Sequence, residues 1–237
     1  MKKTIIIIAV SLIAVATTIF LILYFNGFSG IHNHTDAKEG QIKIACVGDS
    51  ITYGHGIANW QKNNYPAQLQ EFLGDEYHVS NFGHSGKTLS DNGDQPYTES
   101  EQYSLSQSYG ADVLIIMLGT NDSKPENWKN ADTFIKEYEK LVNKYKESNP
   151  DARIILCTPA KAFYPDGKSE GKTNFDIQPS IVEQIRREIR SFALMQGYDC
   201  IDIYALTENH PEWFKDNVHP SKEGANAIAQ AIAERIK

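Results

Sequence analysis

The stretch Asp112–Leu118, DVLIIML, is continuously apolar from Val113 onward, and it leads directly into Gly119-Thr120-Asn121-Asp122. A continuous apolar run of this length is typical of a β-strand whose two faces are both covered, as in a parallel sheet. The glycine and polar residues that follow mark the end of the strand. This stretch therefore predicts a central parallel strand with polar side chains at its carboxyl end.

Shorter apolar runs on either side of this strand alternate with stretches that have helical periodicity. The predicted strands are residues 42–47, 77–82, 112–118, 153–157 and 199–203, and the predicted helical faces lie within 65–73, 131–145, 181–192 and 225–236. This alternation predicts an α/β domain with a parallel sheet between helices. Ligands of such folds bind at the carboxyl ends of the strands. Residues 80–109 have no clear periodicity and are predicted to form a long loop over those ends, with room for a short helix.

Composition excludes several classes of function. The chain has 237 residues and a net charge of −7, with no run of lysine and arginine interleaved with aromatics, so a nucleic-acid partner is not expected. The three widely spaced cysteines, Cys46, Cys157 and Cys200, do not form a disulfide framework. We expect them to be small buried hydrophobic side chains.

The N-terminal segment has its own composition. Lys2 and Lys3 precede residues 4–25, which carry no charge and are long enough to cross roughly 30 Å of hydrocarbon as a helix. No small-x-small cleavage site follows, which favours an uncleaved signal anchor over a cleaved signal peptide and a secreted protein. The sequence thus predicts a transmembrane helix at 1–25, a flexible linker at 26–40 and a globular domain at 41–237. The positive-inside rule places that domain outside the cytoplasm.

Two segments carry residues suited to nucleophilic catalysis. Ser50, in Gly48-Asp49-Ser50, follows the first predicted strand, where a serine could present its hydroxyl at the edge of the sheet. Serine needs a base to act as a nucleophile. In Asp216-Asn217-Val218-His219-Pro220, an aspartate three residues before a histidine can fix the imidazole tautomer and leave the other nitrogen facing a hydroxyl. Each segment taken alone is equally consistent with an ordinary turn or helix cap.

Two other segments could stabilise negative charge. Gly83 and Gly86 lie in the turn after the second strand, where glycine lets the backbone approach a ligand closely. His84, between them, is an alternative base, although solvation is the commoner fate of a loop histidine. Asn121 follows the central strand, and its side-chain amide could donate to a developing oxyanion.

Taken together, these segments resemble the four sequence blocks of the SGNH/GDSL hydrolase superfamily, over residues 43 to about 235. The resemblance implies a flavodoxin-like three-layer α/β/α sandwich with a five-stranded parallel sheet in the order 2-1-3-4-5. It implies Ser50 as nucleophile, His219 as base and Asp216 orienting His219. The implied oxyanion hole consists of the Ser50 N–H, the Gly86 N–H and the Asn121 side chain. No metal or other cofactor is implied.

The substrate is less constrained. Residues 86–97 and 120–128 are similar to those of bacterial carbohydrate O-acetylesterases, which implies removal of acetyl groups from a polysaccharide or a sialic-acid-type sugar. Asp49, Asp91, Tyr97 and Trp128 are candidate substrate-binding residues. The alternatives are a lysophospholipase or acyl-thioesterase, an O-acyltransferase, and a non-catalytic glycan-binding module.

Overall fold

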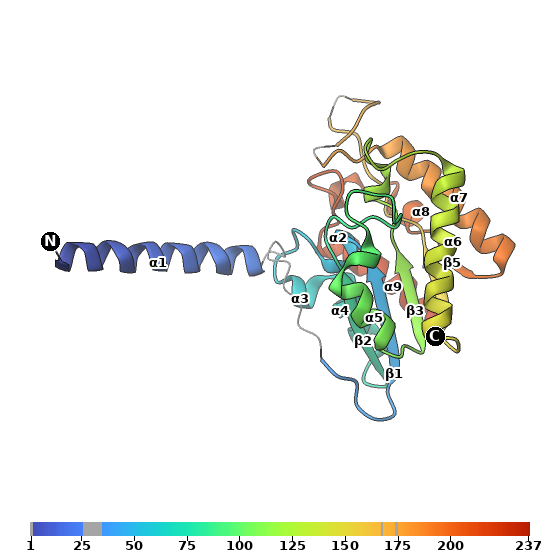
Figure 1. The fold of residues 1–237 in the computed structure, drawn as a ribbon, viewed down its shortest axis with the longest axis horizontal. Helices are drawn as coiled ribbons and strands as arrows, with labels where there is room; N and C mark the ends of the chain where they lie inside the picture. Colours follow the sequence, from blue (N-terminus) through green and yellow to red (C-terminus); the bar gives the residue numbers. More distant parts are fainter. Residues whose placement is uncertain (1, 26–34, 167, 174) are drawn as a thin grey trace.

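The computed structural model describes residues 2–25, 35–166, 168–173 and 175–237, and its centre is one parallel sheet of five strands (Figure 1). The order across the sheet is β2-β1-β3-β4-β5. The strands are β1 (Ile42–Gly48), β2 (Tyr77–Gly83), β3 (Val113–Met117), β4 (Arg153–Cys157) and β5 (Asp199–Ile201). The predicted α/β class, parallel sheet and strand order are confirmed. Gly48 pairs in register with both Gly83 and Met117, so the first three strands end at the same level.

Helices connect the strands, and several begin and end where the sequence predicts. Asn130 caps α6 by accepting the Thr133 N–H at 2.8 Å, and Pro179 opens α7 while Gly197, with φ +74°, ends it. The α-helices are α1 (Lys2–Phe25), α2 (Ser50–Tyr53), α3 (Trp60–Asn63), α4 (Tyr65–Leu73), α5 (Glu101–Ser108), α6 (Ala131–Ser148), α7 (Pro179–Gln196), α8 (Ile203–Thr207) and α9 (Lys222–Ile236). Short 3₁₀ turns lie at Tyr97–Glu99, Asn121–Ser123 and Pro211–Trp213.

The sheet is covered on both faces, which gives the three layers that the family resemblance implies. Alternate residues of one strand point to opposite faces. Ile115 and Met117 of β3 join the cluster that contains residues of α4 and α9. Leu114 and Ile116 join the cluster that contains residues of α6 and α7. All four side chains are at most 2% exposed, as expected for a strand buried on both sides.

Two predicted elements differ in detail from the structure. The fifth strand ends at Ile201, because Asp202 caps α8 by accepting the Ala205 N–H, so Ile203 is already helical. The predicted loop 80–109 begins inside β2, which continues to Gly83, and it contains the short helix that the sequence allowed, α5, capped by Ser100. All three cysteines are free; Cys46 and Cys157 are buried, and Cys200 is partly exposed.

The N-terminal segment is helical from Lys2 to Phe25. Within the residues that the structure describes, no helix is long and apolar enough to cross a membrane, so the predicted membrane-spanning helix is not supported. The predicted linker, 26–40, lies outside the described residues up to residue 34.

Candidate active site

Ser50 is the first residue of α2, and only Asp49 separates it from the end of β1. The carboxylate of Asp49 caps this short helix by accepting the Ile51 N–H at 2.9 Å. Ser50 is 6% exposed, and its side chain lines a cavity of about 280 Å³ at the carboxyl edge of the sheet. The predicted position of the serine at a strand-to-helix junction is confirmed.

Two glycines allow α2 to sit tightly across the strand ends. A Cβ on Gly48 would lie 1.9 Å from the Thr52 hydroxyl oxygen, and a Cβ on Gly83 would lie 2.2 Å from the Tyr53 nitrogen. Both separations are shorter than any non-bonded contact allows. Any other residue at these positions would displace α2, and Ser50 with it.

Asp216 and His219 form a compact hydrogen-bonded turn just before α9. One carboxylate oxygen of Asp216 accepts the Val218 and His219 N–H groups at 3.0 and 2.7 Å. The other oxygen lies 2.8 Å from Nδ1 of His219. Burial alone would raise the pKa of Asp216, but hydrogen bonds from His219 and its charge outweigh this and hold the pKa at about 2. An ionised carboxylate at Nδ1 requires a proton on that nitrogen, which leaves the Nε2 lone pair available.

Nε2 of His219 lies 2.8 Å from Oγ of Ser50, although the two residues are 169 positions apart in sequence. The structure therefore joins Ser50, His219 and Asp216 in one hydrogen-bonded series. In this geometry His219 can accept the serine proton while Asp216 stabilises the resulting imidazolium.

The predicted oxyanion donors lie in the same cavity. Gly86 and Asn121 both line it beside Ser50. Gly86 has φ +82°, a conformation that favours glycine. The side-chain nitrogen of Asn121 donates to the Lys87 carbonyl at 3.1 Å, and that bond orients the amide and leaves its second N–H available. The cavity can therefore hold a carbonyl oxygen near several donors.

Comparison with known proteins agrees with this geometry. The model of the GDSL-like lipase/acylhydrolase family matches residues 46–227. The chain belongs to this family. The family resemblance seen in the sequence is therefore confirmed.

Individual relatives of this GDSL-family chain include sugar-ester hydrolases. An acetylxylan esterase of Xylanibacter ruminicola is 36% identical over 221 residues, which cover 84% of this chain and 44% of that protein. The chain thus spans less than half the length of this curated relative. A carbohydrate acetylesterase from Sinorhizobium meliloti has a TM-score of 0.67 at 20% identity, over 83% of this chain and 98% of that one. An aryl esterase from M. smegmatis has a TM-score of 0.66 at 19% identity, over 82% and 97%. At these identities the two structures show a shared fold.

The loop that carries Gly86 is fixed by buried polar groups that the sequence analysis did not single out. Both carboxylate oxygens of Asp122 accept backbone N–H groups, from Leu89 at 2.8 Å and Ser90 at 2.9 Å. Asn127 donates to the Asn121 carbonyl at 2.9 Å. Burial raises the pKa of Asp122 to about 6, and the two N–H bonds only partly offset that rise. The turn after β3, which contains Asp122, therefore holds the loop that carries Gly86 in place.

Two aromatic rings pack on His219 and were also missed. The ring centroid of His55 lies 4.6 Å from that of His219, and Phe175 meets His219 edge-on at 4.9 Å. Burial lowers the pKa of His55 to about 4, and the nearby His219 charge adds to this effect, so His55 is uncharged at neutral pH. The sequence feature that could have indicated His55 is its position five residues after Ser50. No sequence feature indicated Phe175, which lies in an irregular loop.

The predicted substrate-binding residues are not gathered at this cavity. Asp91 forms ion pairs with Lys140 and Lys144 at 2.6 and 3.2 Å. Tyr97 is fully buried, and its hydroxyl donates to the Phe82 carbonyl.

The other predicted contacts also have structural roles. Trp128 packs against Phe134 on the far side of Asp122. Asp49 is 1% exposed and caps α2 behind Ser50. His84, the alternative base, does not line the cavity. The structure thus does not bring Asp91, Tyr97 or Trp128 to this cavity, and packing and ion pairs inside the domain occupy these side chains.

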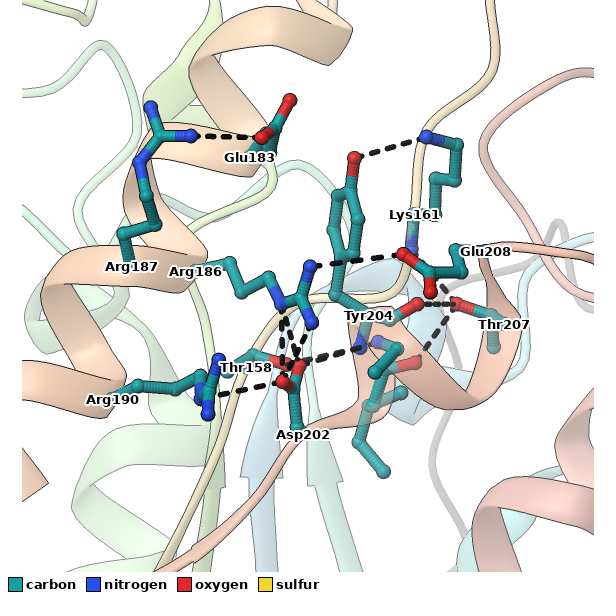
Figure 2. A network of polar contacts seen from close by, with 12 residues as sticks. Thr158, Lys161, Glu183, Arg186, Arg187, Arg190, Asp202, Tyr204, Thr207 and Glu208 are labelled. Carbon is teal, nitrogen blue, oxygen red and sulfur yellow. Dashed lines mark hydrogen bonds and ion pairs between the residues drawn. The ribbon is translucent and has the colours of Figure 1, made fainter.

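A second polar cluster lies at the ends of β4 and β5 (Figure 2). Asp202 is at its centre and receives three hydrogen bonds from the Arg186 guanidinium, with a further contact from Arg190 at 3.3 Å. Thr158 donates to the same carboxylate. Tyr204 lies under the Arg186 guanidinium, 4.6 Å from it. This cluster satisfies its own hydrogen bonds.

Proposed function

We propose that this GDSL-family chain hydrolyses acetyl esters of carbohydrate through an acyl-enzyme on Ser50. The observation that carries the proposal is the unbroken series from Ser50 Oγ to His219 Nε2 and from Nδ1 to Asp216, each step 2.8 Å long. It opens on a cavity that also presents Gly86 and Asn121. These are the parts needed for nucleophilic attack and for stabilising an oxyanion.

The reaction has two balanced stages. In the first, Ser50 Oγ bonds to the carbonyl carbon and its proton passes to His219 Nε2. The ester C–O bond then breaks, and the leaving alcohol takes that proton. In the second, water gives a proton to Nε2 and its oxygen bonds to the acyl carbon. The bond from that carbon to Oγ breaks, Oγ regains the proton and acetic acid leaves.

The size of the cavity and the identity of the relative support acetate and carbohydrate. A volume of about 280 Å³ lies below the usual range of roughly 300–1,000 Å³ for pockets that hold drug-sized ligands, and part of its wall is apolar, from Phe175, Ile177 and Val218. Such a space suits a short acyl group. The relative that shares 36% identity is named as an acetylxylan esterase, so acetylated xylan is the first polymer to test.

The test compares p-nitrophenyl acetate, butyrate and octanoate as substrates for the full chain and for Ser50→Ala. We expect acetate to be preferred and turnover to fall by at least about 10³-fold in the variant, with the fold retained. A preference for octanoate would direct attention to lipid or thioester substrates. Equal activity in Ser50→Ala would contradict the mechanism.

We also propose that the catalytic domain lies outside the cytoplasm. Support comes from Lys2 and Lys3 followed by 22 uncharged residues, a pattern typical of a secretory targeting segment. Adding protease to intact spheroplasts tests this proposal. Digestion of the domain under conditions that spare a cytoplasmic marker is expected, and protection of the domain would contradict the proposal.

A further inference from the structure

A second, larger cavity adjoins the catalytic one. It has a volume of about 500 Å³, and His55 and His219 line both cavities. Its remaining walls come from residues 56–58, from the segment before α9 and from the first turn of α9. Its lining includes Trp213, Lys215, Ser221, Lys222 and Glu223.

The two cavities differ in which of the reacting groups line them. Gly86 and Asn121, the proposed oxyanion donors, line only the smaller cavity. The leaving oxygen must come within hydrogen-bonding reach of His219 Nε2, because it takes its proton from that atom. Because His219 lines both cavities, an alcohol bound beside the His219 ring can extend into the larger cavity.

The lining of the larger cavity is mixed, with one aromatic ring among polar side chains. Trp213 is held in a parallel stack with His210, at a centroid distance of 3.8 Å and an interplanar angle of 5°. Lys215, Lys222 and Glu223 are exposed at the rim. An aromatic body surrounded by hydroxyl, ammonium and carboxylate groups can contact both the C–H surface and the hydroxyl groups of a pyranose. A lipid chain would need continuous apolar walls.

We propose that this second cavity binds the sugar residues on the alcohol side of the scissile ester, so that it selects a polymeric substrate over a small acetate ester. The inference rests on the proposed esterase function. Trp213 and the polar rim fix the position of the sugar chain, and the shared His219 then meets the ester oxygen. The occupant is therefore an O-acetylated polysaccharide with its backbone in the larger cavity.

The first variant fills the cavity without removing a core side chain. Ala58 is exposed and lines the cavity, so Ala58→Trp places a ring in it. Ser191→Trp is the matched control: Ser191 is also exposed, and it lines a cavity of about 590 Å³ beside Arg187 and Tyr198 that shares no residue with the catalytic cavity. Trp213→Ala is a second variant, with its fold checked by circular dichroism. For each full-length protein, kcat/KM is measured on acetylated xylan and on ethyl acetate, whose alcohol is too short to fill the larger cavity.

We expect the ratio of kcat/KM on acetylated xylan to that on ethyl acetate to fall about tenfold or more in Ala58→Trp and in Trp213→Ala, a change worth about 1.4 kcal/mol per tenfold. The ratio should stay within about twofold of wild type in Ser191→Trp. An unchanged ratio in Ala58→Trp, in a protein that hydrolyses both esters, would overturn the inference and leave the esterase function standing. Hydrolysis of neither ester by the wild type would overturn the proposed function and the inference together.

Discussion

Asp216 and Asp202 make the same local hydrogen bond but lie in different regions of the molecule. Each precedes a helix and accepts a backbone N–H three residues ahead, from His219 at 2.7 Å and from Ala205 at 3.2 Å. Hydrogen bonds and nearby cationic groups outweigh burial and lower the pKa of both. Asp216 then pairs with a histidine that faces a serine across a cavity. Asp202 pairs with Arg186, and the two carboxylate oxygens are fully used (Figure 2).

The partner decides what each carboxylate can do. Imidazole gains and loses a proton near neutral pH, so Asp216 can stabilise a charge that appears only during a reaction. Guanidinium stays protonated in proteins, so Asp202 stabilises a permanent charge and adds rigidity. An aspartate that accepts the N–H three residues ahead thus stabilises the local fold in both regions. It takes part in the proposed chemistry only where its partner can gain and lose a proton.

The sharpest test of this comparison is a matched pair, Asp216→Asn and Asp202→Asn. We expect Asp216→Asn to lower kcat by about 10³–10⁴-fold with a small effect on stability, because the amide keeps the geometry but no longer favours the reactive tautomer. Asp202→Asn should keep kcat in the folded protein. It should lower the free energy of unfolding by about 1–3 kcal/mol, since charge-assisted hydrogen bonds are lost at a partly buried site. Steady-state kinetics and urea unfolding of both variants measure the two effects.

The opposite pattern would contradict the comparison. If Asp202→Asn lowered kcat as strongly as Asp216→Asn without unfolding the protein, the cluster in Figure 2 would belong to the reaction. His219→Ala provides the upper limit for the loss of activity, and it should be at least as severe as Asp216→Asn.

The next largest effect is expected from a comparison of the residues that follow two neighbouring strands, β3 and β4. Asn121 follows β3 and lines the cavity, whereas Thr158 follows β4 and bonds to Asp202 and to the Tyr204 N–H. Asn121→Ala removes a proposed oxyanion donor, so we expect kcat to fall about 10²–10³-fold with KM for p-nitrophenyl acetate little changed. Thr158→Ala should cost only stability, about 1 kcal/mol. A loss of activity confined to KM in Asn121→Ala would argue against an oxyanion role.

These comparisons also show what the sequence could and could not predict. Strand order, layers and the meeting of Ser50, Asn121 and His219 followed from apolar periodicity together with a recognised set of motifs, because parallel strands bring their carboxyl ends to one edge. The contacts of Asp91, Tyr97 and Trp128 did not follow. Polar and aromatic residues in an irregular loop have no periodicity that separates those facing a ligand from those facing Lys140 or the Phe82 carbonyl.

The packing of His55 against His219 could not be derived from the sequence either, because it depends on how the turn after α2 lies against the turn before α9. Its counterpart in the other region is Arg186 over Tyr204, at the same 4.6 Å. We expect His55→Ala to lower kcat about tenfold, because His219 loses a ring that fixes its orientation. His55→Phe should restore most of that loss, since His55 is uncharged at neutral pH and acts through its ring.

The rescue by phenylalanine distinguishes positioning from proton transfer. If His55→Phe were as impaired as His55→Ala, a polar function of the imidazole would be indicated. Tyr204→Phe is the matched variant in the other region. It removes the hydroxyl that accepts from Lys161 and keeps the ring under Arg186, so kcat should be unaffected.

The smallest expected effect concerns the pH dependence of stability, and it has opposite signs in the two regions. Burial raises the pKa of Asp122 from 3.8 to about 6, so the folded state keeps this proton at a pH where the unfolded chain has lost it. Its contribution to the free energy of unfolding is therefore complete below about pH 4 and is lost as the pH rises through about 6. Asp202, with a lowered pKa, contributes to the free energy of unfolding above its ordinary pKa and loses that contribution only in stronger acid.

We expect the stability deficit of Asp122→Asn relative to wild type to shrink by on the order of 1–3 kcal/mol between pH 4 and pH 7, measured by urea unfolding, because the variant has no proton to lose. The deficit of Asp202→Asn should stay constant over that range and shrink below pH 4. A pH-independent deficit in Asp122→Asn would mean that this carboxylate is already ionised in the folded protein at pH 4 and that its bonds to the Leu89 and Ser90 N–H groups outweigh burial.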